Sequence, residues 1–396
     1  GVRGKISTPT VPCPGMTVRQ LSLDHERDAM SLTLDELDSH LYGCADKIRN
    51  AVDKTDYKDF ILPLVFYKTI SDTHQDEVEK WTEELGSEEL ARDPDLHDIV
   101  VPEDYTWDEL RGLNTEEKNY DEFINEALSA IEDANAGEQS DGAGESSGEK
   151  LKGVFRADYV SEDALDNERL GNLVEHLSTY NLSAKRVPPD MLGEAYMDLV
   201  RDFAEEEGKE GGEFFTPPKI VRLMVRLLAP FEDGDRFHDP TVGSGGMLVE
   251  AAHYFRDEQG GDPSRLELTG QELNPDIAAI AKMNLFIHGY NGAIERQDSL
   301  SAPQFTENGH LETFDYVLAN FPFSADWAKD KLQDDAYDRF DWHDKLPRAD
   351  RGTTPLSCTW RISLTRRGRQ RLLFPTACSS ASTRDVTGSR CWNGTW

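Results

Sequence analysis

Cysteine is scarce in this sequence and long apolar runs are absent, and these two shortages exclude several classes of protein. The five cysteines have neither the spacing of a metal site nor the pattern of a disulfide framework. They are Cys13, Cys44, Cys358, Cys378 and Cys391. No stretch reaches the roughly 18 apolar residues that a membrane-spanning helix requires, and no charged-then-apolar leader indicates secretion. We therefore expect a cytoplasmic enzyme or assembly subunit with no metal site and no membrane contact.

Basic residues are also scarce. The 396 residues include 42 lysines and arginines against 76 aspartates and glutamates, so the net charge is −34. The aromatic content and the long periodic segments argue against an acidic disordered chain. We interpret the charge as that of a folded halophilic protein, because a salt-rich cytoplasm screens self-repulsion. Lysine and arginine bind DNA phosphates, so a role on DNA requires a partner that supplies much of the contact.

The charge changes sign near the end of the sequence. Residues 351–396 contain eight arginines, one aspartate and no lysine or glutamate, a net charge of +7 that leaves −41 on the first 350 residues. A basic nucleic-acid-binding arm is one interpretation. We favour a frameshift that truncates the protein, because charge, composition and apolar periodicity all change together. On that interpretation we expect the tail to be disordered or poorly packed, and the isolated chain to be unstable and inactive.

Composition and periodicity divide the rest of the chain into five segments. Apolar residues recur at helical spacing from Leu34 to Ile70 and in later stretches up to residue 207. Residues 134–150 are dominated by Gly, Ser, Ala and Glu, the composition of a linker or surface insertion. We predict a disordered leader, an N-terminal helical domain, an acidic Gly/Ser linker, a helical connection and a catalytic α/β domain. Their ranges are 1–29, 30–133, 134–150, 151–210 and 211–350.

Strands and helices alternate in the last of these segments. Strands are predicted at 266–270 and 314–319, and a helix at 275–288. Glu272 comes just past the first of these strands, Asp298 follows another short segment and Asn320 ends the last strand. The carboxyl ends of strands in a doubly wound sheet form one crevice, where ligands bind. We therefore predict a doubly wound, Rossmann-like α/β domain, incomplete at its C-terminus and preceded by an all-α domain.

A glycine-rich turn lies at residues 239–246, which read Asp-Pro-Thr-Val-Gly-Ser-Gly-Gly. An apolar-periodic run follows it directly, so we predict a tight turn that leads into a helix. Glycine allows unusual backbone dihedrals and close approach of a ligand, and the free amides at the helix start face that ligand. Such a loop is often only a turn, but the strands that follow favour a binding loop. A side chain at Gly245 is expected to enter the binding site.

A second glycine-rich stretch lies at residues 211–218. In it, two phenylalanines are followed by Thr216 and then by two prolines. Threonine before two prolines predicts a helix that begins with a hydroxyl cap. The cap does not account for Phe214 and Phe215, which suit a flat ligand.

The motif Asn320-Phe321-Pro322-Phe323 follows the last predicted strand. The oxygen of Asn320 and the carbonyl of residue 321 can accept both hydrogens of an exocyclic amine on a flat base. Drawing the nitrogen lone pair out of conjugation makes the amine nucleophilic, and Phe323 can stack on the ring. A plain turn is the alternative interpretation.

Together and in this order, these motifs resemble the modification (M) subunits of type I restriction–modification systems. The resemblance covers roughly residues 32–345 and includes segments 57–62 and 67–72 of the helical domain and segment 151–155. It implies an S-adenosylmethionine-dependent DNA adenine-N6 methyltransferase. The residues expected to form the cofactor site are Glu213, Phe214, Phe215, Thr216, Pro217, Pro218, Asp239, Gly243, Ser244, Gly245, Gly246, Glu272 and Asp298. Within this set, Glu272 is expected to accept hydrogen bonds from the ribose hydroxyls, and Asp298 to lie near the cofactor adenine.

The same resemblance implies that Asn320, Pro322 and Phe323 are the catalytic residues, which hold an adenine flipped out of double-stranded DNA. It implies a specificity subunit and a restriction subunit as partners. The sequence departs from the family's Asn-Pro-Pro-Phe at Phe321, where the backbone carbonyl suffices. Two other functions remain open, namely a protein-glutamine N-methyltransferase and a catalytically inactive subunit. A nicotinamide dehydrogenase is disfavoured, because the Gly-x-Gly-x-x-Gly spacing is absent.

Overall fold

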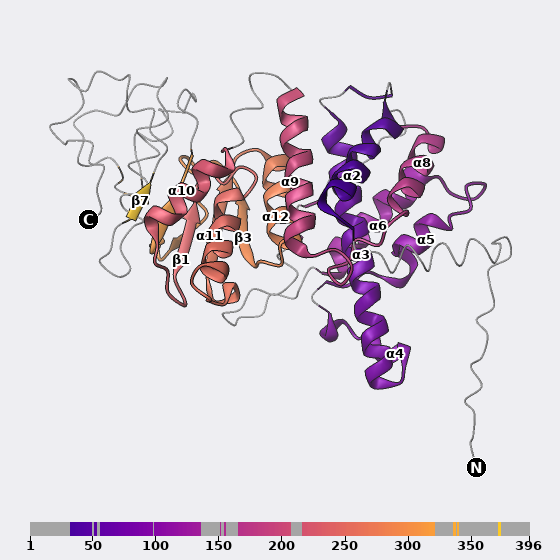
Figure 1. Cartoon of the computed structure of the whole chain (residues 1–396), viewed down its shortest axis with the longest axis horizontal. Coiled ribbons are helices and arrows are strands. Elements are labelled where there is room, and N and C mark those ends of the chain that lie inside the picture. Colours follow the sequence, from indigo (N-terminus) through magenta and orange to yellow (C-terminus); the bar gives the residue numbers. More distant parts are fainter. Residues whose placement is uncertain are drawn as a thin grey trace, which may run out of the picture.

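The computed structural model describes the chain in several stretches (Figure 1). They are residues 32–49, 51–53, 56–97, 99–135, 151, 154–155, 165–206, 216–320, 336–337, 339 and 371–373. The expected leader, 1–29, lies outside them, as does the expected linker apart from residues 134–135.

The N-terminal part is helical. Its helices are α2 (Leu34–Ile48), α3 (Tyr57–Leu85), α4 (Glu88–Ala91), α5 (Trp107–Arg111), α6 (Tyr120–Ala134), α8 (Asn167–Leu177) and α9 (Pro189–Glu206). Helix α2 begins at a capping box, in which the Glu36 amide donates to Thr33 Oγ1 (3.3 Å) and the Thr33 amide donates to Glu36 Oε2 (3.0 Å). Helices α8 and α9 pack on α2. Among the helices that the structure describes, none is both long and apolar enough to cross a membrane.

A buried ion pair lies on α3, and its aspartate also accepts a hydrogen bond from the segment before α9. Lys68 Nζ lies 2.6 Å from Asp72 Oδ1, and the Leu182 amide donates to Asp72 Oδ2 at 2.7 Å. Burial raises the pKa of the Asp72 carboxyl, and Lys68 opposes part of that rise. Removing one partner of a buried pair leaves an uncompensated charge, which is strongly destabilising. The Leu182 amide can reach Asp72 only while the segment before α9 lies against α3, so this hydrogen bond favours that packing.

Helix α12 (Pro275–Ile287) lies between the helical part and the sheet (Figure 1). Ile280, Met283 and Ile287 on α12 belong to the core of the N-terminal helices. Ala281 and Leu285 on the same helix belong to the core against the sheet. The N-terminal helices therefore rest directly on a helix of the α/β part.

The sheet is parallel, with the strand order β3-β2-β1-β6-β7. Its strands are β1 (Arg236–Asp239), β2 (Glu267–Glu272), β3 (Gly292–Arg296), β6 (Tyr316–Leu318) and β7 (Arg371–Leu373), and β4 (Thr306–Glu307) and β5 (His310–Leu311) form a separate hairpin. Helices α10 (Pro218–Leu228), α11 (Gly246–Asp257) and α12 pack side by side in one core. The chain runs outward from β1 to β3 and then returns to β6 on the other side of β1, so a crevice opens between β1 and β6. The predicted doubly wound α/β fold is confirmed.

Strand β7 belongs to the tail that was expected to be disordered. Its three residues pair in parallel with residues 316–318 of β6. The expectation is therefore wrong for residues 371–373. Strand β6 would otherwise present unpaired backbone groups at the sheet edge, and an extended segment satisfies them. Apart from these three, residues 351–396 lie outside the described part of the chain.

Candidate functional site

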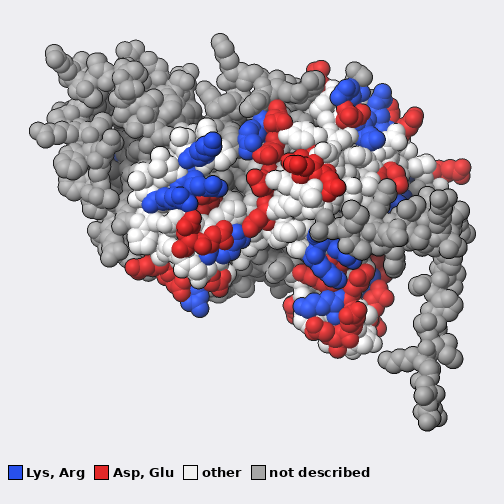
Figure 2. Space-filling model, in the orientation of Figure 1, with Lys and Arg blue, Asp and Glu red and all other residues white. Residues whose placement is uncertain are grey.

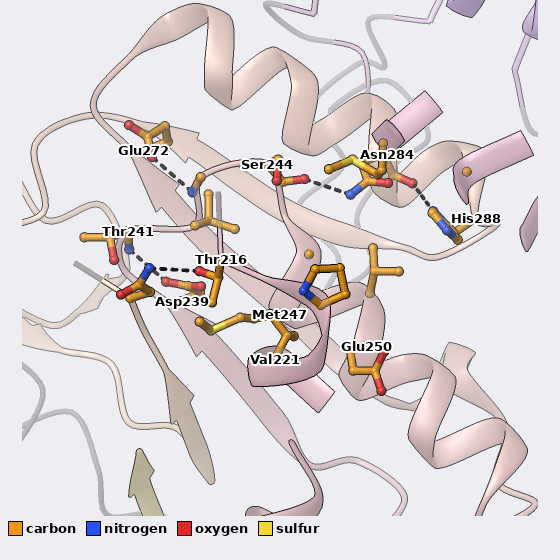
Figure 3. Close-up of a pocket in the computed structure, with 18 of the residues that line it drawn as sticks. Thr216, Val221, Asp239, Thr241, Ser244, Met247, Glu250, Glu272, Asn284 and His288 are labelled. Atoms are coloured by element: carbon orange, nitrogen blue, oxygen red, sulfur yellow. Dashed lines mark hydrogen bonds between the residues drawn. The ribbon is translucent and has the colours of Figure 1, made fainter. Parts of the chain in front are cut away.

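A cavity of about 950 Å³ opens at the carboxyl ends of the central strands and extends between α9 and α11 (Figure 3). Of the residues expected from the sequence, it is lined by Thr216, Pro218, Asp239, Gly243, Ser244, Gly246, Glu272, Asp298 and Asn320. Pro217 and Gly245 are described but are not in its wall. Glu213, Phe214, Phe215, Pro322 and Phe323 lie outside the described residues.

The glycine loop uses its glycines in different ways. Gly243 and Gly245 have left-handed backbone angles, with φ of 54° and 83°, which disfavour other residues. A Cβ on Gly245 would meet Ala281 of α12 at 3.4–3.5 Å, so the expectation that it enters the cavity is wrong. A Cβ on Gly246, the first residue of α11, would meet nothing within 4 Å. Gly246 is thus the position from which a side chain would project into the open space of the cavity.

Two polar side chains hold this loop in place (Figure 3). Glu272 accepts the Gly243 amide at Oε2 (3.1 Å) and the Asn274 amide at Oε1 (3.0 Å). Asn284 of α12 donates from Nδ2 to the carbonyl of Ser244 (2.8 Å). Sequence reasoning did not single out Asn284. The sequence feature that could have indicated its role is a polar residue on the otherwise apolar face of the helix predicted at 275–288. Glu272 is also the last residue of β2, and the sequence had placed it just beyond the strand.

Two acidic side chains stand at the ends of β1 and β2: Asp239 is buried and Glu272 is half-buried. Asp239 Oδ1 accepts the Thr241 amide at 3.0 Å, and the residue is 1% exposed. Burial raises the pKa of Asp239 to about 8, although the Thr241 amide opposes the rise, and the neighbouring Glu272 raises it further. Burial also raises the pKa of Glu272, against the backbone amides that it accepts. The pKa of Asp239 therefore lies well above that of an ordinary aspartate.

This burial predicts a pH-dependent stability that Asp239→Asn removes. The folded-state pKa is raised, so the stabilising contribution is full below the ordinary pKa of 3.8 and is lost as the pH rises toward about 8. The free energy of unfolding of the wild type should fall between pH 5 and pH 8 by up to about 1.4 kcal/mol per pH unit more than that of the variant. Chemical denaturation at constant salt measures both slopes. Asp35→Asn, on the exposed first turn of α2, is the control. Parallel curves for wild type and Asp239→Asn would contradict the assignment.

Asn320 lies two residues beyond β6, beside the end of β1. Its Nδ2 atom donates to Thr216 Oγ1 at 3.0 Å. Helix α10 has Pro217 as its N-cap residue, and no side chain caps it. The prediction that the Thr216 hydroxyl caps this helix is therefore wrong. The hydroxyl instead joins the segment before α10 to the residue that follows β6.

Asp298 lines the cavity, but its carboxylate is engaged within its own turn. It accepts the Leu300 amide (3.0 Å) and the Ser301 hydroxyl (2.7 Å). The adjacent Ser299 hydroxyl donates to the carbonyl of Pro240 at 2.5 Å. The turn after β3 is thereby fixed against the end of β1.

Helix α9 forms the far end of the cavity. Its Asp190 pairs with Arg256 (2.7 Å) and with His253 (3.1 Å), both on α11. Burial tends to raise the pKa of Asp190, but the hydrogen bond from Arg256 and the nearby positive charges outweigh burial and hold it below its ordinary value. Within the described stretches, no group of three or more His, Cys, Asp or Glu side chains is arranged to hold a metal ion.

Two family models match the chain. The HsdM N-terminal domain matches residues 37–177 and the N-6 DNA Methylase family matches residues 187–368. The first match covers most of the helical part and the second covers the sheet. Together they leave little of the described chain unmatched.

Individual relatives agree with these models. The methylase subunit of the type I restriction enzyme MjaIX from Methanocaldococcus jannaschii is 31% identical over 309 residues, which are 76% of this chain and 53% of the relative. The HindI methylase subunit from Haemophilus influenzae is 34% identical over 227 residues, 54% of this chain and 46% of the relative. This chain thus spans about half the length of the curated relatives that it matches.

The fold also has a solved counterpart. The methyltransferase subunit of the type I restriction–modification system from Streptococcus thermophilus superimposes with a TM-score of 0.67 at 24% identity, over 87% of this chain and 75% of that one. With both family models and the curated relatives in agreement, the chain belongs to the family of modification (methylase) subunits of type I restriction–modification systems.

Proposed function

We propose that this chain transfers a methyl group from S-adenosylmethionine to the N6 amine of adenine in DNA, as the modification subunit of a type I complex. The observation that carries the proposal is the position of Asn320. Its carboxamide follows β6 in the wall of the same cavity as the glycine loop and Glu272. The amide and the cofactor loop therefore face one shared space at the carboxyl ends of adjacent strands.

The cavity fits an adenosine-type cofactor by volume and by the chemistry of its wall. Ligand pockets commonly measure about 300–1,000 Å³, and this one lies near the upper end of that range. Glu272, at the end of β2, provides carboxylate oxygens for ribose hydroxyls, and Gly246 leaves open space at the start of α11. When bound, S-adenosylmethionine supplies an electrophilic methyl group.

Asn320 acts on the target amine in this proposal. The Oδ1 atom accepts a hydrogen bond from the exocyclic N6 amine. This bond keeps the lone pair of the amine nitrogen out of conjugation with the adenine ring. Held in this way, the amine nitrogen would attack the methyl group that a bound S-adenosylmethionine would supply in exchange for its bond to sulfur, and the proton that the amine gives up would leave to solvent. The adenine must be extruded from the duplex to reach this position.

Contact with DNA is proposed to depend on partner subunits. On the face shown in Figure 2, lysines and arginines occur in small groups separated by acidic side chains. The first 350 residues carry a net charge of −41, and phosphate affinity comes from lysine and arginine. We propose that a specificity subunit supplies target recognition and that a restriction subunit completes the complex, in a cytoplasm of high salt.

Methylated-base sequencing tests this proposal. DNA from cells that express this chain together with its specificity subunit should carry N6-methyladenine at one recurring sequence. Cells that express the specificity subunit alone are the control. A complex that assembles and binds cofactor but leaves adenine unmodified would establish the non-enzymatic alternative.

A further inference from the structure

We propose that Thr216 is a positioning residue that holds the Asn320 carboxamide in its reactive orientation, an inference that rests on the proposed methyl transfer. The structure provides a direct contact, the 3.0 Å hydrogen bond from Asn320 Nδ2 to Thr216 Oγ1. Figure 3 shows Thr216 at one end of this bond, in the wall of the cavity.

The hydroxyl of Thr216 is not engaged as a helix cap. Helix α10 starts at Pro218 after Pro217, and no side chain caps it. A capping hydroxyl needs backbone N–H groups at the start of the helix, and prolines have none. The two prolines remove the amides of residues 217 and 218, and the Thr216 hydroxyl accepts from Asn320 Nδ2 instead.

Asn320 needs such a restraint because of its place in the fold. The ladder between β1 and β6 ends at the pair of His238 with Val317, and β6 itself ends at Leu318. Asn320 lies beyond the last strand residue, where no strand pairing fixes it. Thr216, by contrast, precedes a helix whose buried face, including Val221 and Val225, packs in the core of the sheet. A fixed element thus restrains a residue that the sheet does not hold.

The orientation of the carboxamide decides its chemistry. The two ends of an asparagine side chain have similar shapes, but the nitrogen donates hydrogen bonds and the oxygen accepts them. With Nδ2 bonded to Thr216, Oδ1 is the end that can accept from a target amine. A carboxamide turned the other way would direct N–H groups at the N–H groups of the amine. The bond from Nδ2 to Thr216 holds one end of the carboxamide and leaves Oδ1 facing the position of the target amine, which favours the productive pairing.

The test compares Thr216→Val, which keeps the shape but removes the hydroxyl, with Thr216→Ser, which keeps the hydroxyl. The full chain is used together with its specificity subunit, and kcat, KM for DNA and the Kd for S-adenosylmethionine are measured. Loss of one well-placed hydrogen bond should lower kcat in Thr216→Val by about 10- to 100-fold. The cofactor Kd should stay within about twofold, and Thr216→Ser should restore kcat to within about threefold of the wild type.

A double-mutant cycle shows whether the effect passes through Asn320. In an Asn320→Ala background, which has no group for Thr216 to bond, Thr216→Val should cause little further loss of the residual kcat. Additive losses in the cycle would overturn the inference. So would an unchanged kcat in Thr216→Val, or a Kd that rises at least tenfold while kcat holds, which would make Thr216 a cofactor contact.

The inference and the proposed function fail in different ways. A wild-type complex that methylates DNA while Thr216→Val matches it would refute the positioning role alone. A wild-type complex that forms no N6-methyladenine would refute both. Thermal midpoints of the two variants within about 3 °C of the wild type show that the comparison is made on folded protein.

Discussion

Replacing Asn320 with alanine is expected to abolish methyl transfer and to leave cofactor binding within about twofold of the wild type. The variant removes the group that accepts hydrogen bonds from the target amine, and a donor or acceptor that acts on the reacting atoms contributes about 10²- to 10³-fold to kcat. The glycine loop and Glu272 are proposed to bind the cofactor. Glu272 accepts the amides of Gly243 and Asn274, and Asn284 donates to the loop, so neither depends on Asn320.

The measurement is N6-methyladenine formation by the complex with its specificity subunit, alongside isothermal titration with S-adenosylmethionine. Asn114→Ala, an exposed asparagine in the N-terminal helical part, is the matched control and should behave as the wild type. Residual methylation by Asn320→Ala within tenfold of the wild type would show that Asn320 is not catalytic.

Filling the cavity from Gly246 is expected to block cofactor binding without loss of fold. A Cβ at this position meets nothing within 4 Å, so a leucine would project into the space that the cofactor is proposed to occupy. Gly246→Leu should weaken S-adenosylmethionine binding by at least about 100-fold, because a ligand cannot share van der Waals volume with a side chain. Its thermal midpoint should be equal or higher, since glycine is a poor helix former.

A graded series controls for this effect. Gly246→Ala adds a single methyl group and should lose less affinity than Gly246→Leu. Gly245→Ala is the contrasting variant, because its φ of 83° disfavours any residue with a side chain and predicts a loss of stability. Equal cofactor affinity in Gly246→Leu and wild type would show that the cofactor binds elsewhere.

Much of this molecule was predictable from local patterns. Apolar spacing predicted the helices around Leu37 and Leu41 because a helical stripe must be buried. The alternation of strands and helices predicted the doubly wound sheet, and the rule that ligands bind at the carboxyl ends of its strands brought Asp239, Glu272, Asp298 and Asn320 to one cavity. Both predictions depend only on the spacing of apolar residues and on the order of elements along the chain, which can be read from the sequence.

Contacts between distant residues were not predictable in this way. Thr216 was expected to cap a helix, yet its hydroxyl meets a side chain 104 positions away. Gly245 was expected to face the ligand, but its Cβ direction depends on a left-handed φ and on the placement of α12. Asn284 supports the glycine loop across 40 positions, and the apolar spacing in its helix gave only a weak indication of this contact.

The sequence by itself determined the family, the class of fold and the set of residues at the strand ends, because each depends on the order and spacing of neighbours along the chain. Only the tertiary structure decided which glycine borders open space, which hydroxyl meets Asn320 and which helix supports the loop. Those outcomes depend on side-chain directions and on the packing of α10 and α12 against the sheet, and atoms far apart in sequence set both. Side-chain directions cannot be read from residue order alone, because they depend on which helices pack together in the folded chain.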